Sequence, residues 1–227
     1  MNCPNDFLEI RDGKYGFSPL IGRFCGMRIP RRPVRAISGY MWMRFHSDDI
    51  LEYRGFEAEY QFVRSPKERL RHNIDCLITE TAQHDGFIQT MHMHKFYEHY
   101  RNSTGNLECV WKVVSPTADL QMRFFMREFE LGKPNLCQMN FMEVYSGTTA
   151  DQPVRKFCGL TASNVATSSN IAYVRIFATG EAMQGLNIRA LFSTYTKSKN
   201  CSGESLFSCG DDSCVPLSVV CNKRTNC

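Results

Sequence analysis

Hydrophobic residues occupy every second position in three stretches of this chain, 56–62, 120–126 and 186–192. Side chains of a β-strand point alternately to its two faces, so these stretches are predicted to be half-buried strands. Gly, Pro, Ser and Asn separate such stretches at short spacing, and no convincing amphipathic helix is indicated. The pattern predicts an all-β fold of the antiparallel β-sandwich class.

One module occurs twice along the chain. Cys3–Gly13 (CPNDFLEIRDG) matches Cys137–Gly147 (CQMNFMEVYSG) without a gap, and RFCG at 23–26 matches KFCG at 156–159. The second copy has a long upstream half that starts near Cys76, whereas the first copy has two residues before its first Cys. We therefore expect the first copy to be truncated.

Polar, charged stretches set the expected domain boundaries. They predict linkers at 65–74 and 197–200, which leave half a module at 1–64, a complete module at 75–196 and a short tail at 201–227. The tail holds five cysteines, Cys201, Cys209, Cys214, Cys221 and Cys227. A segment this short cannot bury a real core, so we expect disulfides to hold it together.

Composition narrows the function classes. The 227 residues are 43% hydrophobic and 22% charged, values that exclude disorder, collagen and coiled coil. The net charge of +4 is too small to indicate nucleic acid as a partner, and no apolar run is long enough for a membrane helix. The first residues do not resemble a signal peptide.

The cysteine content conflicts with the absence of a signal peptide. Eleven Cys without a Cys-x-x-Cys pair indicate disulfides and an extracellular environment. The odd count and the absent signal lead us to expect a fragment of a longer protein.

The repeated module resembles the CUB domain, a jelly-roll-like antiparallel β-sandwich. The resemblance rests on Phe7–Gly13 (FLEIRDG), Phe24–Gly26 (FCG) and Arg54–Tyr60 (RGFEAEY) in the first copy, and on Cys109–Trp111 (CVW) in the second. The tail resembles a low-density-lipoprotein-receptor class A (LDLa) repeat, of which it carries the first five cysteines.

The order CUB, CUB, LDLa, together with the run Gly16–Gly26, resembles the neuropilin and tolloid-like (Neto) family. This resemblance implies a single-pass membrane protein on the extracellular face of the plasma membrane, at synapses, whose membrane segment lies outside this chain. It implies a partner, the ectodomain of an ionotropic glutamate receptor of the kainate type, and an auxiliary subunit that modulates it. The alternative is a non-catalytic CUB and LDLa arm of a secreted protease or developmental regulator.

The resemblance also implies the disulfide pairing. The pairs expected from it are Cys3–Cys25, Cys76–Cys109, Cys137–Cys158, Cys201–Cys214 and Cys209–Cys227, which leave Cys221 unpaired.

Calcium is the one cofactor that the resemblance suggests. Many CUB domains bind Ca²⁺ through an upstream Glu and two Asp, and Asp6 and Asp48 match the two Asp in the first copy; otherwise they are two solvated loop acids. In the second copy Asn140 and Thr179 stand at these positions, so that copy is expected to be metal-free.

The LDLa-like tail also lacks acidic calcium ligands that are typical of its class. Asn222 and Asn226 replace the two Asp that usually contribute to its calcium cage. Neutral amides attract Ca²⁺ less than carboxylates do, so we do not expect the tail to need metal in order to fold.

Other motifs carry weaker hypotheses. His92 and His94, with His99, could bind Zn²⁺ if they lay on a strand, but an exposed polar strand or loop is the simpler interpretation.

The run 28–35 (RIPRRPVR) is either a surface loop or a site for an acidic partner, and Asn102 begins a glycosylation sequon. No catalytic motif is found, so we expect a binding protein and not an enzyme.

Overall fold

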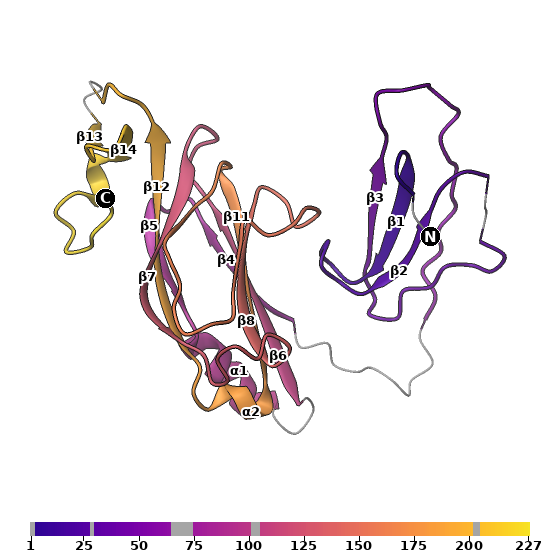
Figure 1. The fold of residues 1–227 in the computed structure, drawn as a ribbon, viewed down its shortest axis with the longest axis horizontal. Coiled ribbons are helices and arrows are strands. Elements are labelled where there is room, and N and C mark those ends of the chain that lie inside the picture. The colour runs from indigo at the N-terminus through magenta and orange to yellow at the C-terminus, as the bar shows by residue number, and fades with distance from the viewer. Residues whose placement is uncertain (1–2, 28–29, 65–74, 101–104, 202–204) are drawn as a thin grey trace. The chain divides into compact units, whose positions relative to one another are not determined.

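The computed structural model describes residues 3–27, 30–64, 75–100, 105–201 and 205–227. Its residues form two compact units, Met1–Asn73 and Ile74–Cys227 (Figure 1). The expected linker at 65–74 and the sequon at Asn102 lie outside the described residues. At the second expected linker, 197–200, the last strand of the sandwich ends at Lys197, and residues 198–200 have no regular secondary structure.

The N-terminal unit holds one antiparallel sheet of three strands in the order β2-β1-β3. The strands are β1 (Phe7–Asp12), β2 (Leu20–Phe24) and β3 (Met41–His46). Exposure alternates along β3, where Met41, Met43 and Phe45 are 39%, 55% and 52% exposed. The described residues of this unit supply no second sheet to cover that face.

The strand predicted at 56–62 is not formed. Residues 51–64 have no regular secondary structure and are exposed, although Phe56 contacts Phe45 with 5.4 Å between ring centroids. The matching pattern at 186–192 does form a strand, because it pairs with a neighbour on each side. Alternation alone does not make a strand when no adjacent strand satisfies its backbone.

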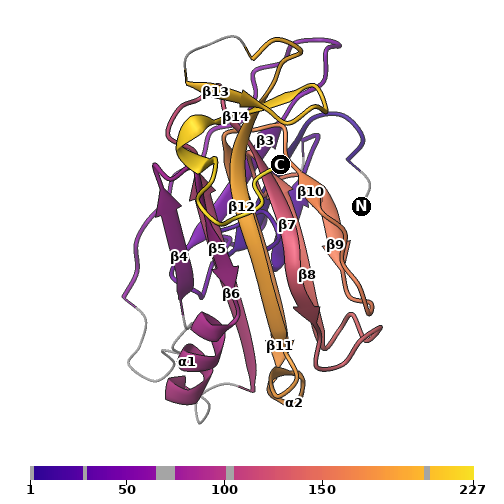
Figure 2. The same ribbon diagram turned by 90° about the vertical axis from the view of Figure 1, so that its left-hand side faces the viewer.

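The second unit contains most of the regular structure (Figure 2). Its strands are β4 (Cys76–Thr81), β5 (Asp85–Gln89), β6 (Asn106–Val114), β7 (Gln121–Glu130), β8 (Asn140–Ser146), β9 (Arg155–Phe157), β10 (Val165–Ala166), β11 (Ile171–Thr179), β12 (Asn187–Lys197), β13 (Leu206–Ser208) and β14 (Ser213–Pro216). Two short helices, α1 (Met91–Tyr100) and α2 (Gly180–Met183), and a 3-10 turn, η1 (Leu217–Val219), complete it.

Two sheets pack face to face in this unit. One has the order β4-β6-β11-β8-β9; the other runs β10-β7-β12-β14-β13, with β5 also paired to β12. Their inner faces bury one apolar cluster in which Trp111, Phe124 and Phe192 are fully buried. The all-β sandwich predicted from the sequence is confirmed.

One strand pair departs from the antiparallel expectation. β4 runs parallel to β6, with Cys76 directly opposite Cys109. The disulfide between these two residues ties the edge strand to its neighbour. Parallel strands need a long crossover connection, and here β5 and α1 lie in it.

The helix α1 corrects the expectation of no amphipathic helix and of an exposed strand or loop at 90–95. Met93 is fully buried, and Phe96 and Tyr97 pack against the same core. These three positions have the i, i+3, i+4 spacing of a helix face. The neighbouring histidines, His92, His94 and His99, make this pattern hard to recognise, because they occupy polar positions with residues of intermediate hydropathy.

Candidate functional site

Each copy of the module buries one glutamate on a strand, and in the second copy this glutamate faces away from the sandwich core. Glu9 on β1 and Glu143 on β8 stand at the same place in the repeated motif and are 3% and 5% exposed. Glu9 lies opposite Arg44 on β3, and Glu143 lies opposite Arg175 on β11. The two copies therefore have the same strand pairing around this acid, with a basic residue opposite it on each neighbouring strand.

Cations surround Glu143. Arg175 Nη1 and Lys156 Nζ each lie 2.9 Å from its carboxylate, and the Tyr145 hydroxyl donates to it at 2.8 Å. Burial raises the pKa of Glu143, but the bonds from Lys156, Tyr145 and Arg175 outweigh it and hold the pKa below its ordinary value of 4.5. Arg175 also pairs with Glu108, at 2.5 Å.

The first copy repeats this arrangement with other cations. Arg23 Nε donates to Glu9 at 2.9 Å, and Arg11 Nε donates to it at 2.6 Å. Burial again opposes ionisation, and the two arginines again hold the pKa of Glu9 below its ordinary value. In the sequence this glutamate is distinguished only by its recurrence, as Glu9 and Glu143, at the same position of the repeated motif.

The two acids expected to bind calcium come together at one end of the first sheet. The Asp48 backbone N–H donates to Asp6 Oδ1 at 3.0 Å, and Asp48 Oδ1 accepts from the Ile50 N–H at 2.9 Å. Two carboxylates on adjacent loop ends match calcium's preference for hard oxygen ligands. Within the described residues no group of three or more His, Cys, Asp or Glu forms a metal cluster.

The second copy fills the same place with uncharged hydrogen bonds. Asn140 is fully buried; its Oδ1 accepts from the Lys133 N–H at 2.8 Å and its Nδ2 donates to the Lys133 carbonyl at 2.7 Å. Thr179 precedes α2, and its hydroxyl accepts from the Ala182 N–H at 3.4 Å. Both side chains are thus engaged with the backbone.

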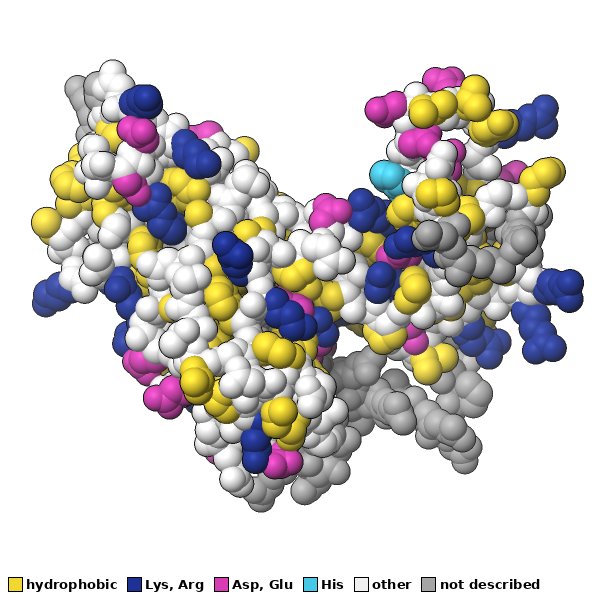
Figure 3. Space-filling view, viewed as in Figure 1, with side chains coloured by type: hydrophobic (Ala, Val, Ile, Leu, Met, Phe, Trp, Pro, Cys, Tyr) yellow, Lys and Arg dark blue, Asp and Glu magenta, His cyan; other side chains and the backbone are white. Residues whose placement is uncertain are grey.

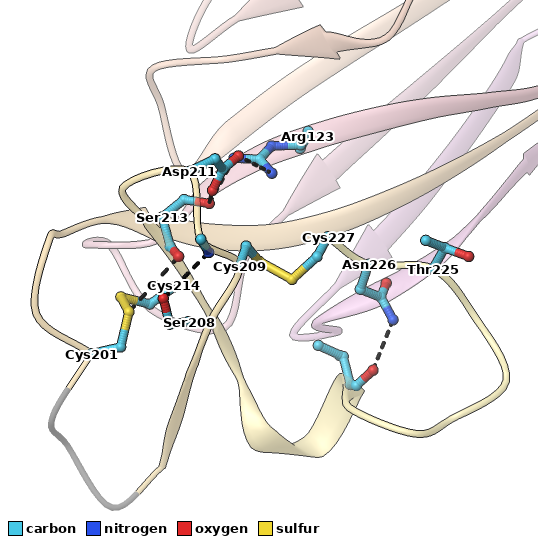
Figure 4. The surroundings of a disulfide bond; sticks show 12 residues. Arg123, Cys201, Ser208, Cys209, Asp211, Ser213, Cys214, Thr225, Asn226 and Cys227 are labelled. Carbon is cyan, nitrogen blue, oxygen red and sulfur yellow. Dashed lines mark hydrogen bonds and ion pairs between the residues drawn. A yellow bond between two sulfur atoms is a disulfide. The ribbon is translucent and has the colours of Figure 1, made fainter.

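Five disulfides join the cysteines that the resemblance pairs. They are Cys3–Cys25, Cys76–Cys109, Cys137–Cys158, Cys201–Cys214 and Cys209–Cys227. Cys221 is free and exposed. Figure 4 shows the two bridges of the C-terminal segment 201–227, which we call the C-terminal repeat.

The candidate zinc histidines are separated by the helix. His92 and His94 stand two positions apart on α1, a spacing that turns them toward opposite sides. His94 Nε2 instead lies 2.8 Å from the Leu186 carbonyl, and His92 Nδ1 is buried without a hydrogen-bond partner in the described structure.

The basic run at 28–35 is described only from residue 30 onward. Arg31, Arg32 and Arg35 are exposed. Figure 3 shows Lys and Arg side chains scattered over both units, together with hydrophobic side chains that reach the surface. The N-terminal unit contributes many of the latter, including Ile37, Leu51, Tyr53 and Tyr60.

Asn222 and Asn226 occupy the expected cage loop of the C-terminal repeat. Asn226 is 5% exposed, and its Nδ2 donates to the Val219 carbonyl at 2.9 Å and to Asn222 Oδ1 at 3.1 Å. One amide N–H₂ group thus bonds two oxygens of this loop. Asn222 Nδ2 in turn donates to Asp85 on β5 at 2.7 Å.

Comparison with known proteins agrees with this architecture. The CUB domain family model matches residues 1–60 and 79–189. Neuropilin and tolloid-like protein 2 of Mus musculus is 33% identical over 99% of this chain, and neuropilin and tolloid-like protein 1 of the same species is 30% identical over 99%. Tolloid-like protein 1 of Homo sapiens is 31% identical over 74% of this chain and 19% of its own length.

The likeness to solved structures is more distant. The CUB1-EGF-CUB2 domain of human MASP-1/3 aligns with 85% of this chain and 82% of its own, at 14% identity and a TM-score of 0.35.

The described helices contain no segment that is long and apolar enough to cross a membrane. The chain spans 42% of the length of the neuropilin and tolloid-like relatives that it matches. Since the family model covers most of the chain and these relatives align with nearly all of it, the chain belongs to the CUB-domain family, among the neuropilin and tolloid-like proteins.

Proposed function

We propose that this chain is the extracellular, non-catalytic binding region of an auxiliary subunit that associates with kainate-type glutamate receptors and modulates them. Family membership over nearly the whole chain is the observation that carries the proposal. The effect of such a subunit is a bias between receptor states, which comes from unequal binding to those states.

The chemistry of the chain supports an extracellular binding role. Five disulfides suit an oxidising compartment. The outer sheet faces carry ordered ion pairs and stacked rings, such as Phe141 against Phe177 at 5.4 Å between centroids. Side chains already held in place lose little conformational entropy when a partner binds them.

The receptor partnership can be tested by co-purification. The full-length protein, expressed with a kainate-type receptor, should co-purify with it, and deletion of either CUB module should reduce recovery of the receptor by at least about tenfold, a loss of ~1.4 kcal/mol of binding. A receptor of another ion-channel class is the control. Equal recovery of both receptors, or none of the kainate receptor when it is correctly folded, would contradict the proposal.

The alternative is a non-catalytic arm of a secreted protease or developmental regulator. The similarity to Tolloid-like protein 1 is the observation that favours it. The sequence of the full-length transcript distinguishes the two functions, because a membrane helix after the LDLa segment supports the first and a protease domain supports the second.

We further propose that the first CUB copy binds calcium through Asp6 and Asp48. Their two carboxylates would supply part of the six to eight oxygens that Ca²⁺ takes. The ion would hold together the loop before β1 and the loop after β3, which already meet through the bond between Asp48 N–H and Asp6. The second copy, with Asn140 bonded to backbone at this place, would need no ion.

Calorimetric melting of the full-length protein in calcium and in chelator tests this assignment. We expect calcium to raise the melting of the first module only, since a ligand that binds only the folded state stabilises it by mass action. Asp48→Ala should remove the shift, whereas Asp49→Ala, next to it in the loop, is the matched control and should keep it. A calcium shift in the second module would refute the assignment.

A further inference from the structure

We propose that the C-terminal repeat and the second CUB module act as one rigid body, joined by a docking surface in which Asn222 and Arg224, from the repeat's expected calcium loop, bind the carboxylate of Asp85. The surface lies on the outer face of the sheet that contains β5, β7 and β12. It requires no calcium.

The first argument is the burial of an outward-facing row on β12. Ala190 and Phe192 belong to the sandwich core, so the residues between and beyond them point away from it. Yet Leu191, Ser193 and Tyr195 are 1%, 1% and 2% exposed. Tyr195 forms a separate apolar cluster with Val215 and Val219 of the repeat. The repeat is too small to have a core of its own, and Val215 and Val219 instead form a small core with Tyr195 of the module.

Asp85 is the anchor at one side of this surface. Its carboxylate accepts from Asn222 Nδ2 at 2.7 Å and from Arg224 Nη1 at 3.1 Å. The Asp85 side chain is 13% exposed, so the ion pair with Arg224 is partly shielded from water. The Arg224 guanidinium also lies over the ring of Phe87, 5.0 Å from its centroid.

Arg123 on β7 anchors another part of the repeat (Figure 4). Its guanidinium lies 3.3 Å from Asp211 Oδ2, donates to Ser213 Oγ at 3.0 Å, and stacks over Tyr195 at 4.4 Å. The Arg123 side chain is 16% exposed. One partly buried cation thus connects the repeat's loop to an aromatic residue of the module.

The backbone continues the same connection. β14 pairs with the end of β12, with Thr196 opposite Cys214 and Lys197 opposite Ser213. Arg127 on β7 donates to the Thr225 carbonyl at 2.7 Å. The contacts therefore involve the middle of the repeat, at 211–214, and its C-terminal part, at 222–225, which prevents it from swinging about the strand connection.

Inside the loop, an amide takes the place that a cation would occupy. The Asn226 Nδ2 group donates to the Val219 carbonyl and to Asn222 Oδ1. Because Asn226 bonds Asn222 through its Oδ1, the Asn222 Nδ2 group can donate to Asp85. The loop therefore presents N–H donors, from Asn222 and Arg224, to the Asp85 carboxylate of the module.

Hydroxyl-radical footprinting of the full chain tests the docking. Tyr195 labelling reports the undocked state, and labelling of the core residue Trp111 reports unfolding of the module. Asp85→Asn should raise Tyr195 labelling about tenfold, equivalent to ~1.4 kcal/mol, with no change at Trp111. Glu98→Gln removes the same charge from the exposed side of α1 and should change neither. Unchanged Tyr195 labelling in Asp85→Asn overturns the proposal.

A charge exchange separates docking from folding. Asp85→Arg and Arg224→Asp should each raise Tyr195 labelling, and the double variant should restore it to within about threefold of the unmodified protein, because the pair is re-formed in reverse. If both single variants also increase Trp111 labelling, the double variant still tests the proposal. Failure of the double variant to restore the protection of Tyr195 overturns it. Calcium and chelator should give equal labelling of the unmodified protein; a calcium-dependent change at Tyr195 would overturn the metal-free docking.

Discussion

Trp111→Ala should destabilise the second unit by about 4 kcal/mol, roughly 10–15 °C in its melting temperature. Trp111 is fully buried at the centre of the core cluster, on β6 between β4 and β11. The substitution leaves a cavity that the two packed sheets cannot fully close. Differential scanning calorimetry of the full chain measures the effect.

Two companion variants define the cause. The Trp111 Nε1–H is buried without a hydrogen-bond partner in the described structure, so Trp111→Phe removes volume but also an unsatisfied donor and should cost about 1–2 kcal/mol. Trp42→Ala is the matched control, because Trp42 lies on β3 of the other unit and should leave the melting of the second unit unchanged. A similar cost for Trp111→Phe and Trp111→Ala would contradict the cavity explanation.

Glu143→Ala should destabilise the second unit by about 3 kcal/mol, which is the lower end for breaking a buried ion pair because the Lys156 side chain is 43% exposed. The substitution leaves Arg175, whose side chain is 18% exposed, with one of its two carboxylates. Glu108→Ala removes the other one. Glu108 is 36% exposed and can be replaced by water, so its loss should cost less than about 1 kcal/mol.

The same glutamate should make the unit sensitive to acid. Its pKa in the folded state lies below the ordinary value of 4.5, so its ionised form stabilises the fold above that pH. This contribution is lost as the pH falls through the folded-state pKa. Between about pH 5 and pH 3 the melting temperature should therefore fall more steeply in the unmodified protein than in Glu143→Gln. Parallel curves would show that Glu143 contributes no pH-dependent stability.

Much of the architecture could be read from the sequence because it depends on local pattern. Alternation at 120–126 and 186–192 marked β7 and β12, and the duplicated motif placed a Glu at the same strand position in each copy. The cysteines that the resemblance pairs are those that the structure joins. Asp6 and Asp48, 42 residues apart, meet because the module's strand order brings those loops together.

Three features were decided by tertiary structure alone. The stretches at 56–62 and 186–192 share one pattern, but only the second lies between strands that complete its hydrogen bonds, so only the second is a strand. The stretch 91–100 became a helix because the core accepts Met93, Phe96 and Tyr97 on one side. Asp85 and Arg224 are 139 residues apart, and no sequence pattern predicts that they pair. Their pairing follows from the way in which the repeat covers β12, since local periodicity determines a strand's faces but not what packs on its outer one.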